Sequence, residues 1–258
     1  MAGGRGSRMG GDLPKVLHEV AGRPMLAWVL RACRDAGVTD AVVVVGYQEA
    51  KVRDAARSLD LEGLRVHFAV QAQQLGTGHA VMMAAETLLP HRDADTLVLC
   101  GDGPLITGET LHRILSAHRD HGAPCTLATA VLEDPTGYGR VVRGDDGGFV
   151  EIVEEKDATE AQRRIREVNP SYYAFRVAAL LSALDRLGND NAQGEYYLTD
   201  VPGLMAQDRS DAVRLVADVP AEQILGVNTP DDLAHVERLL QIRSAANGEP
   251  ASSTRDAT

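Results

Sequence analysis

The sequence predicts an α/β fold, with a Rossmann-like, mainly parallel sheet flanked by helices and an antiparallel layer added in the second half. In the first half of the chain, β-branched runs alternate with helix-like segments across short joints, which is typical of right-handed βαβ units. Beyond about residue 121, short strands follow one another across turns instead. With 44% hydrophobic and 24% charged residues among 258, the composition is that of a globular protein.

The strands expected in the first half are short apolar runs. Ala41–Val45 is a continuous β-branched run, as expected of a strand that is buried on both faces, and Arg65–Val70 and Thr96–Cys100 follow this pattern more weakly. Between and after these strands, apolar residues recur at helical spacing. They predict helices over Pro24–Ala36, Thr77–Leu89 and Thr107–His121.

The second half is expected to contain more strands than helices. Asp145–Gly148 is a strong turn signal between two β-rich runs and predicts a hairpin. The expected strands are Thr126–Val131, Gly139–Arg143, Phe149–Val153 and Val168–Phe175, and the expected helices are Val177–Leu187 and Thr229–Ile242. From Ser244 onward the residues are small and polar, so we expect one domain over residues 1–243 and a disordered tail over residues 244–258.

The charge and the cysteine content indicate which partners and which cellular compartment are unlikely for this protein. A net charge of −11 argues against a nucleic-acid or anionic membrane partner. The 3 scattered cysteines fit neither a disulfide framework nor a metal cluster, and they suit a reducing compartment. No apolar run approaches the ~20 residues of a membrane-spanning helix, and the first residues lack the apolar stretch of a secretory signal. We therefore expect a cytoplasmic protein, whose oligomeric state the sequence leaves open.

The first residues form a glycine-rich loop that carries positive charge. Residues Gly3–Gly11 include 5 glycines together with Arg5 and Arg8, and Lys15 follows. Glycines let backbone amides approach an anion, so this combination suits a polyphosphate. It is neither a Walker loop nor a dinucleotide fingerprint, because Asp12 and Met9 stand where those motifs require other residues. Taken alone, a flexible start with incidental arginines remains an alternative.

The segment MAGGRGSRMGGDLPKVLHEVAGRPML resembles the signature of the sugar nucleotidyltransferases, in particular the bacterial N-acetylglucosamine-1-phosphate uridylyltransferases. Further blocks follow in that family's order, so the resemblance covers about residues 1–240. They are residues 71–80, 101–102, 134–140, 152–158, 191–200 and 226–228. The resemblance implies Mg²⁺-dependent transfer of a uridylyl group from UTP to N-acetylglucosamine 1-phosphate, which gives UDP-N-acetylglucosamine, a peptidoglycan precursor, and pyrophosphate.

The resemblance also implies which residues act on the phosphates. Arg8 and Lys15 are the expected catalytic residues, where negative charge converges, and the loop at Ala2, Gly3 and Gly4 would hold the nucleotide. Asp102 and Asn228 would hold Mg²⁺. No general base is expected, because a sugar phosphate is already ionised at neutral pH.

Each of these residues also has a structural explanation. Asp102 could cap a turn, although it follows a strand at the edge where open α/β sheets bind ligands. Asn228 could be the N-cap of the last helix. Lys15 could be an ordinary surface lysine. His79 is expected to pack or cap a helix, since the reaction leaves it no proton to move.

For the uracil base and the sugar, the resemblance implies two further groups of substrate-binding residues. The nucleotide side comprises Gln71, Gly76, Thr77 and Gly101, with the Gln71 amide facing the uracil edge. Alternatively, Gln71 is an ordinary polar residue at the end of a strand. The sugar side comprises Gly139, Glu154 and Asn169, and Tyr196 and Tyr197 either wall the sugar pocket or belong to the core.

Two departures from the family pattern keep alternatives open. Pro170 follows Asn169 where a small pair is expected, so the protein could be a uridylyl- or thymidylyltransferase for another sugar 1-phosphate. Met1 stands where the last residue of an apolar strand belongs. A catalytically inactive nucleotide-sensing domain is therefore a second alternative. We also expect that an apolar strand belongs upstream of Met1, because the strand feeding such a loop is central in a doubly wound sheet.

Overall fold

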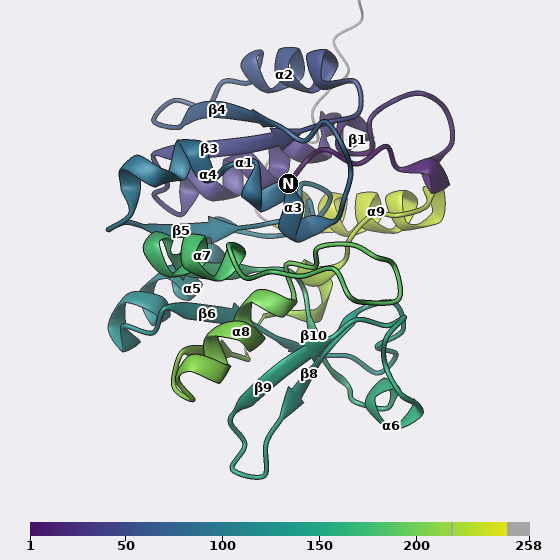
Figure 1. The fold of residues 1–258 in the computed structure, drawn as a ribbon. Helices are drawn as coiled ribbons and strands as arrows, with labels where there is room; N and C mark the ends of the chain where they lie inside the picture. The colour runs from purple at the N-terminus through teal and green to yellow at the C-terminus, as the bar shows by residue number, and fades with distance from the viewer. Residues whose placement is uncertain (218, 247–258) are drawn as a thin grey trace, which may run out of the picture.

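The computed structural model describes residues 1–217 and 219–246 and contains a central twisted sheet between helical layers (Figure 1). Strand pairings, with Met1 and Ala2 joining its two parts, give one order across this sheet. It runs β4 (Arg65–Val70), β3 (Asp40–Val45), Met1–Ala2, β5 (Asp95–Val98), β11 (Tyr173–Arg176), β6 (Cys125–Ala128) and β12 (Val213–Val216). β11 is antiparallel to both neighbours, while the β3–β4 and β6–β12 pairs are parallel. The predicted α/β class with its mainly parallel sheet is confirmed.

The two faces of the sheet pack against different helices. Val43 and Val45 of β3 lie in one apolar cluster with α1 (Met25–Asp35) and α5 (Gly108–His121), whereas Val44 packs on the opposite face against α3 (Thr77–Met82). This alternation follows from the period of two in a strand. Because both faces are covered, a continuous valine run is the sequence that β3 requires.

The antiparallel layer is a second sheet with the order β7 (Ala130–Val131), β10 (Glu167–Asn169), β8 (Gly139–Arg143) and β9 (Phe149–Val153). Its β8–β9 hairpin turns where predicted: Gly147 has a φ of 77°, and the Asp146 carboxylate accepts a hydrogen bond of 2.9 Å from the Gly148 amide. Asn169 of β10 is paired with Gly139 of β8, so the hairpin positions both residues at one edge of this layer.

Two segments predicted as single strands are divided between the sheets. Val168–Phe175 was expected to be continuous, but β10 ends at Asn169 and β11 begins at Tyr173 in the central sheet. Pro170 cannot donate to a strand ladder, and Ser171 has a φ of 61°, so the chain turns between them. Thr126–Val131 likewise divides, at Thr129, into β6 and β7.

The helices differ from the prediction mainly at their ends. The helix expected over Thr77–Leu89 divides into α3 and α4 (Ala85–Leu88), whereas α7 (Val177–Leu184) is shorter than predicted. The sequence reading missed three helices with polar surfaces, α2 (Glu49–Arg57), α6 (Glu160–Arg163) and α8 (Asp200–Asp208), and the half-buried strand β12. In α2 only Val52 and Ala56, one helical turn apart, are buried, so its apolar signal is weak.

The last helix, α9 (Pro230–Ala246), extends beyond its predicted end. Residues 244–246 are therefore helical, which corrects the start of the expected tail, and residues 247–258 lie outside the described residues. Within the described part, the helices are all too short or too polar to cross a membrane.

Met1 and Ala2 bridge β3 and β5 in the middle of the sheet. The Met1 amine donates to the Leu99 carbonyl at 2.8 Å, and the Gly101 amide donates to the Met1 carbonyl at 2.9 Å, a parallel pairing with the end of β5. On the other side, the Ala2 amide donates to the Val44 carbonyl at 2.8 Å. These two residues hold the halves of the sheet together and start the glycine loop at its carboxyl edge.

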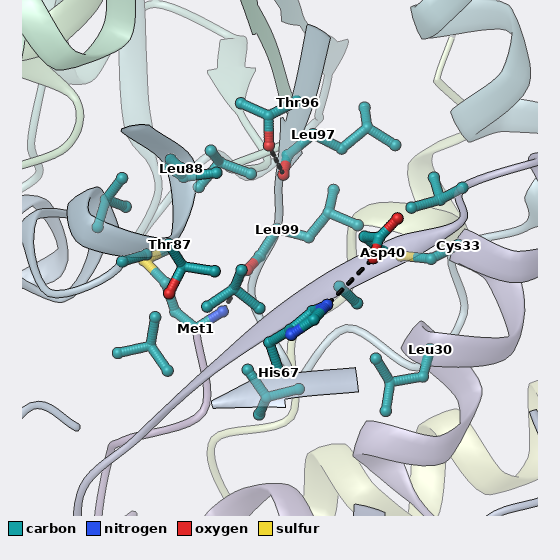
Figure 2. Close-up of a pocket in the computed structure, with 18 of the residues that line it drawn as sticks. Met1, Leu30, Cys33, Asp40, His67, Thr87, Leu88, Thr96, Leu97 and Leu99 are labelled. Carbon is teal, nitrogen blue, oxygen red and sulfur yellow. Dashed lines mark hydrogen bonds and ion pairs between the residues drawn. The ribbon is translucent and has the colours of Figure 1, made fainter. Parts of the chain in front are cut away.

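A cavity of about 430 Å³ continues from Met1 between β3 and β5 (Figure 2). Leu30 and Cys33 of α1 and Leu88 of α4 help to line it, with Leu97 and Leu99 on the β5 side. In the described strand pairings, β3 and β5 do not bond to each other. Because N–H and C=O groups alternate in direction along a strand, the Met1 and Ala2 bonds imply that those of Val42 and Leu97 face this space.

An apolar strand added before Met1 is expected to stabilise the protein. A segment of about five to eight β-branched residues would pair with both cavity walls, and each buried backbone group satisfied contributes about 1–3 kcal/mol. The melting temperature should rise by about 5–10 °C, at roughly 2–4 °C per kcal/mol for a chain of this size. An extension of equal length made of Gly and Ser is the control, and equal melting temperatures for the two extensions would contradict the prediction.

Candidate active site

The glycine loop leaves the sheet at Ala2 and folds back across Lys15. The Gly3 carbonyl accepts hydrogen bonds from the Tyr47 amide at 3.0 Å and from Gln74 Nε2 at 2.6 Å, which fixes the start of the loop. Gly6 has a φ of 70°, and a Cβ atom added there would lie 2.6 Å from Lys15 Cβ. Glycine is therefore required at this crossing both for its backbone angle and for space.

Four of the residues singled out in the sequence converge on one point. Lys15 Nζ donates to Asp102 Oδ2 and, at 2.8 Å, to Asn228 Oδ1. Arg8 Nη2 donates to the same Asn228 oxygen at 3.0 Å. The Lys15 side chain is only 15% exposed and that of Asp102 24%, so the ion pair is well shielded from water. The structure thus brings together the expected catalytic and metal-binding residues.

Asn228 is not the N-cap of the last helix, and this frees its side chain for the site. The Thr229 hydroxyl accepts from the Asp232 amide at 3.2 Å, while Asp232 Oδ2 accepts from the amides of Asn228 and Thr229, both at 2.9 Å. Burial would raise the pKa of Asp232, but these amide donors outweigh it and hold the pKa below its usual value. The spacing of Thr229 and Asp232 is a capping signature that sequence reasoning missed.

The two oxygens around Lys15 form a donor set that fits Mg²⁺. The Asp102 carboxylate and the Asn228 amide both present hard oxygen ligands, and the Val227 amide donates to the Asp102 carbonyl at 3.0 Å, which ties their two segments together. Among the described residues, groups of three or more His, Cys, Asp or Glu that could enclose a metal do not occur. A cation held here would take its other ligands from phosphate and water, as Mg²⁺ commonly does.

Gln71, which is expected to bind the nucleotide, lies buried directly after β4 and beside the loop. Its Nε2 donates to the Gly76 carbonyl at 2.9 Å and lies 3.2 Å from His79 Nδ1. A Cβ atom on Gly3 would stand 3.1 Å from Gln71 Oε1, so the loop and the side chain are in close contact. His79 packs here, in the structural position that the sequence favoured.

Glycine at position 76 lets two distant segments meet. Gly76 has a φ of 110°, and a Cβ there would lie 2.5 Å from the Tyr196 carbonyl. The Tyr196 amide donates to the Leu75 carbonyl at 2.8 Å, and Thr77 Oγ1 accepts from the Leu198 amide at 3.0 Å. The Thr77 side chain therefore has a structural contact of its own, whatever it contributes to a ligand. Gly101, whose amide bonds Met1, likewise lies at the start of the loop.

Gly139, one of the residues expected to bind a sugar, lies between Glu154 and Asn169. A Cβ on Gly139 would stand 3.7 Å from both Glu154 carboxylate oxygens, and Gly139 is the strand partner of Asn169. Asn169 already has two protein partners: its Nδ2 donates to the Tyr173 hydroxyl at 2.7 Å, and its Oδ1 accepts from the Ser171 amide at 2.9 Å. The turn that Pro170 begins thus fixes the orientation of the Asn169 amide.

Two residues near Glu154 belong to the motif block 191–200, but the sequence assigned neither of them a role. The Thr199 hydroxyl donates to Glu154 Oε1 at 2.9 Å, and Asp200 begins α8 beside it. Burial raises the pKa of Glu154. Burial, together with the negative charges of Glu154 and Asp157, raises the pKa of Asp200 to about 6. Only the fold creates this crowding of carboxylates, because α8 and β9 are distant in the sequence.

Comparison with known proteins gives consistent matches over most of the chain. Residues 1–207 match the family model described as MobA-like NTP transferase domain. Proteins described as bifunctional protein GlmU are similar to 94% of this chain: 47% identity in Heliobacterium modesticaldum, 45% in Geobacter metallireducens and 43% in Thermoanaerobacter pseudethanolicus. The matches cover 51%, 50% and 51% of those proteins, so the chain spans about half the length of these curated relatives.

Substituting Asp200→Asn is expected to stabilise the protein at neutral pH. The pKa of Asp200 in the folded protein, about 6, lies above the ordinary value of 3.8. Protonated Asp200 therefore stabilises the folded state below pH 3.8, and this contribution is lost as the pH rises through 6. Because Asp200 is partly exposed, removing its charge should raise the free energy of unfolding by only about 1–2 kcal/mol at pH 7.5. The melting temperature should rise by roughly 3–6 °C. Thermal unfolding at pH 7.5 and pH 4.5 measures this. A gain that is equal at both pH values would show that ionisation of Asp200 is not its cause.

Proposed function

Because the chain belongs to the MobA-like NTP transferase domain family, we propose that it transfers a uridylyl group from UTP to N-acetylglucosamine 1-phosphate. The observation that carries the proposal is the convergence of Lys15, Arg8, Asp102 and Asn228 beside a glycine loop. The choice of UTP and of this sugar rests on the motif blocks that resemble the uridylyltransferases. The similarity to bifunctional GlmU proteins supports the same choice.

In the proposed reaction, a phosphate oxygen of the sugar 1-phosphate attacks the α-phosphorus of UTP. A new P–O bond forms there as the bond to the β-phosphate oxygen breaks, and pyrophosphate leaves with the electron pair. The nucleophile is already an anion, so the reaction needs no general base. Its main difficulty is the approach of two negative charges, which correctly positioned cations and amides relieve.

Each charged residue has a place in this scheme. Lys15 would contact the phosphates where nucleophile and α-phosphate meet, while Arg8 and the amides of Gly3 and Gly4 would hold the departing pyrophosphate. Asp102 and Asn228 would hold Mg²⁺, which supplies Lewis-acid neutralisation of phosphate charge when bound. The acidic chain therefore places two cationic side chains, those of Arg8 and Lys15, together at this edge of the sheet.

Specificity would come from the buried groups on either side of this centre. The carboxamide of Gln71, which lies next to the Gly76 carbonyl, would form hydrogen bonds with the edge of the uracil base. Glu154 and Asn169 would bind sugar hydroxyls and the acetamido group around Gly139. The Asn169 amide is held by Tyr173 and Ser171, which supports a second candidate, transfer to another sugar 1-phosphate.

A cytoplasmic location remains a prediction from the scattered cysteines. That nucleic acids and membranes are not partners remains a prediction from the net charge of −11. The substrates that we propose are themselves anions, and Arg8 and Lys15 would attract them locally.

The test is pyrophosphate release from a matrix of nucleoside triphosphates and sugar 1-phosphates. We expect UTP with N-acetylglucosamine 1-phosphate and Mg²⁺ to give the highest rate. Asp102→Asn keeps the shape of the side chain but removes its charge, so turnover should fall by a factor on the order of 10² or more while the protein still folds.

The controls separate the alternatives. Glu160→Gln removes one carboxylate charge from the exposed helix α6 and should leave the rate unchanged. A higher rate with another sugar phosphate would support the second candidate, and absence of release with every pair would support the inactive nucleotide-sensing alternative. A near-wild-type rate for Asp102→Asn at saturating Mg²⁺ would contradict the assignment of Asp102.

A further inference from the structure

One lysine ammonium holds both of the oxygens that would hold the metal ion. Lys15 Nζ donates to Asp102 Oδ2 and to Asn228 Oδ1, the latter at 2.8 Å. Arg8 bonds only the second of these oxygens, at 3.0 Å. An oxygen lone pair directed at an ammonium proton cannot at the same time ligate a divalent cation. A cation bound through the same two lone pairs would therefore take the position of the Lys15 ammonium.

The fold fixes the base of Lys15 but leaves its end able to move. Its backbone lies in a 3₁₀ turn, Lys15–Leu17, where the His18 amide donates to the Lys15 carbonyl at 3.2 Å. Gly6 packs against Lys15 Cβ, which sets the stem across the glycine loop. Beyond that contact the side chain is a flexible methylene chain, and its ammonium can swing between the Asp102 carboxylate and the loop without any backbone change.

We propose that Lys15 is a placeholder for the divalent cation. In the protein without nucleotide its ammonium neutralises Asp102 and keeps the Asp102 and Asn228 oxygens directed at one point. Entry of the cation releases it towards the phosphates bound at the loop. This inference rests on the proposed function for the identity of the anion, but not for the competition itself.

The exchange has a thermodynamic consequence. The metal ion alone must displace Lys15 from two acceptors and leave its charge nearby, so it should bind weakly to the free protein. A triphosphate changes this balance, because it offers Lys15 new acceptors and the cation new oxygen ligands. Metal and nucleotide should therefore bind cooperatively, each strengthening the other by the same factor.

Arg8 provides the internal comparison. It carries the same charge and donates to the same Asn228 oxygen. Its side chain is exposed, however, and has no hydrogen bond to Asp102. If these residues weakened metal binding only through their positive charge, removing either one would have the same effect. If Lys15 occupies the metal position itself, removing Lys15 should have the larger effect.

The experiment measures Mn²⁺ affinity without nucleotide, from the free Mn²⁺ signal in electron paramagnetic resonance. Lys15→Met removes the ammonium and keeps the length of the chain, so Mn²⁺ should bind about tenfold more tightly than to the wild type. Arg8→Met should give a distinctly smaller gain. Lys51→Met, which removes the same charge from exposed α2, is the matched control and should give none.

Adding UTP provides a second arm with the opposite sign. With the phosphates present, Lys15 no longer competes and instead binds the triphosphate, so Lys15→Met should then bind Mn²⁺ less tightly than the wild type. Combining Lys15→Met with Asp102→Asn should abolish the gain seen without nucleotide, which locates the ion. If Lys15→Met fails to fold, Lys15→Gln should show the same order with a smaller gain.

Several results would overturn the proposal. These are unchanged or weaker Mn²⁺ binding by Lys15→Met without nucleotide, equal gains for the Lys15 and Arg8 variants, or a gain that survives Asp102→Asn. A loss of pyrophosphate release with every substrate pair would refute the proposed function and leave the nucleotide-free arm intact. The two failures are therefore distinguishable.

Discussion

The contact of the Lys15 ammonium with Asp102 and Asn228 is the interaction on which the candidate site depends. It joins residues that lie 87 and 213 positions from Lys15 in the sequence. Shielded ion pairs of this kind contribute little net stability, because desolvation of the charges offsets their attraction. Removing one partner is costly, however, since it leaves the other charge uncompensated. The pair therefore serves chiefly to fix positions, and it keeps two acceptor oxygens directed at one cation.

The sheet makes this contact possible. Met1 and Ala2 bond the end of β5 on one side and the end of β3 on the other, so the glycine loop begins at the carboxyl edge, close to Asp102. The last helix then returns to the same edge, where Asp232 caps it and leaves the Asn228 side chain available. Ligands of open α/β sheets bind at such edges because the strand ends and loops converge there. In the antiparallel layer, strand pairing places Gly139 and Asn169 side by side, next to Glu154.

The sequence was most informative where burial alone decides the structure. β3 was predicted to within one residue, because a β-branched run suits a strand that is covered on both faces. The edge strand β4 was predicted to the residue, although most of its side chains are exposed or only half-buried. It was least informative where one segment serves two sheets. Apolar residues continue through Val168–Phe175, but the chain turns at Pro170 and Ser171, and the change of sheet is a tertiary feature. Polar α2 was missed because only one stripe of two residues is buried.

The candidate site shows the same division. The motif blocks identified Lys15, Asp102 and Asn228, and the structure brings them together. The blocks could not indicate that Asp232 and Thr229 cap α9 in place of Asn228, or that Asp200 lies among other carboxylates, since both depend on distant chain segments. The capping role of Asp232 could have been predicted from its spacing to Thr229. The raised pKa of Asp200 could not, because it depends on carboxylates that only the fold brings together.

High-resolution structures of the chain alone and with Mg²⁺ and UTP test the central claim most directly. We predict that Lys15 Nζ lies within hydrogen-bond distance of the Asp102 and Asn228 oxygens in the first. In the second it should lie on a phosphate, with the cation between those two oxygens. A Lys15 ammonium that points into solvent without ligands, or that stays on Asp102 when the cation and nucleotide are bound, would contradict the account.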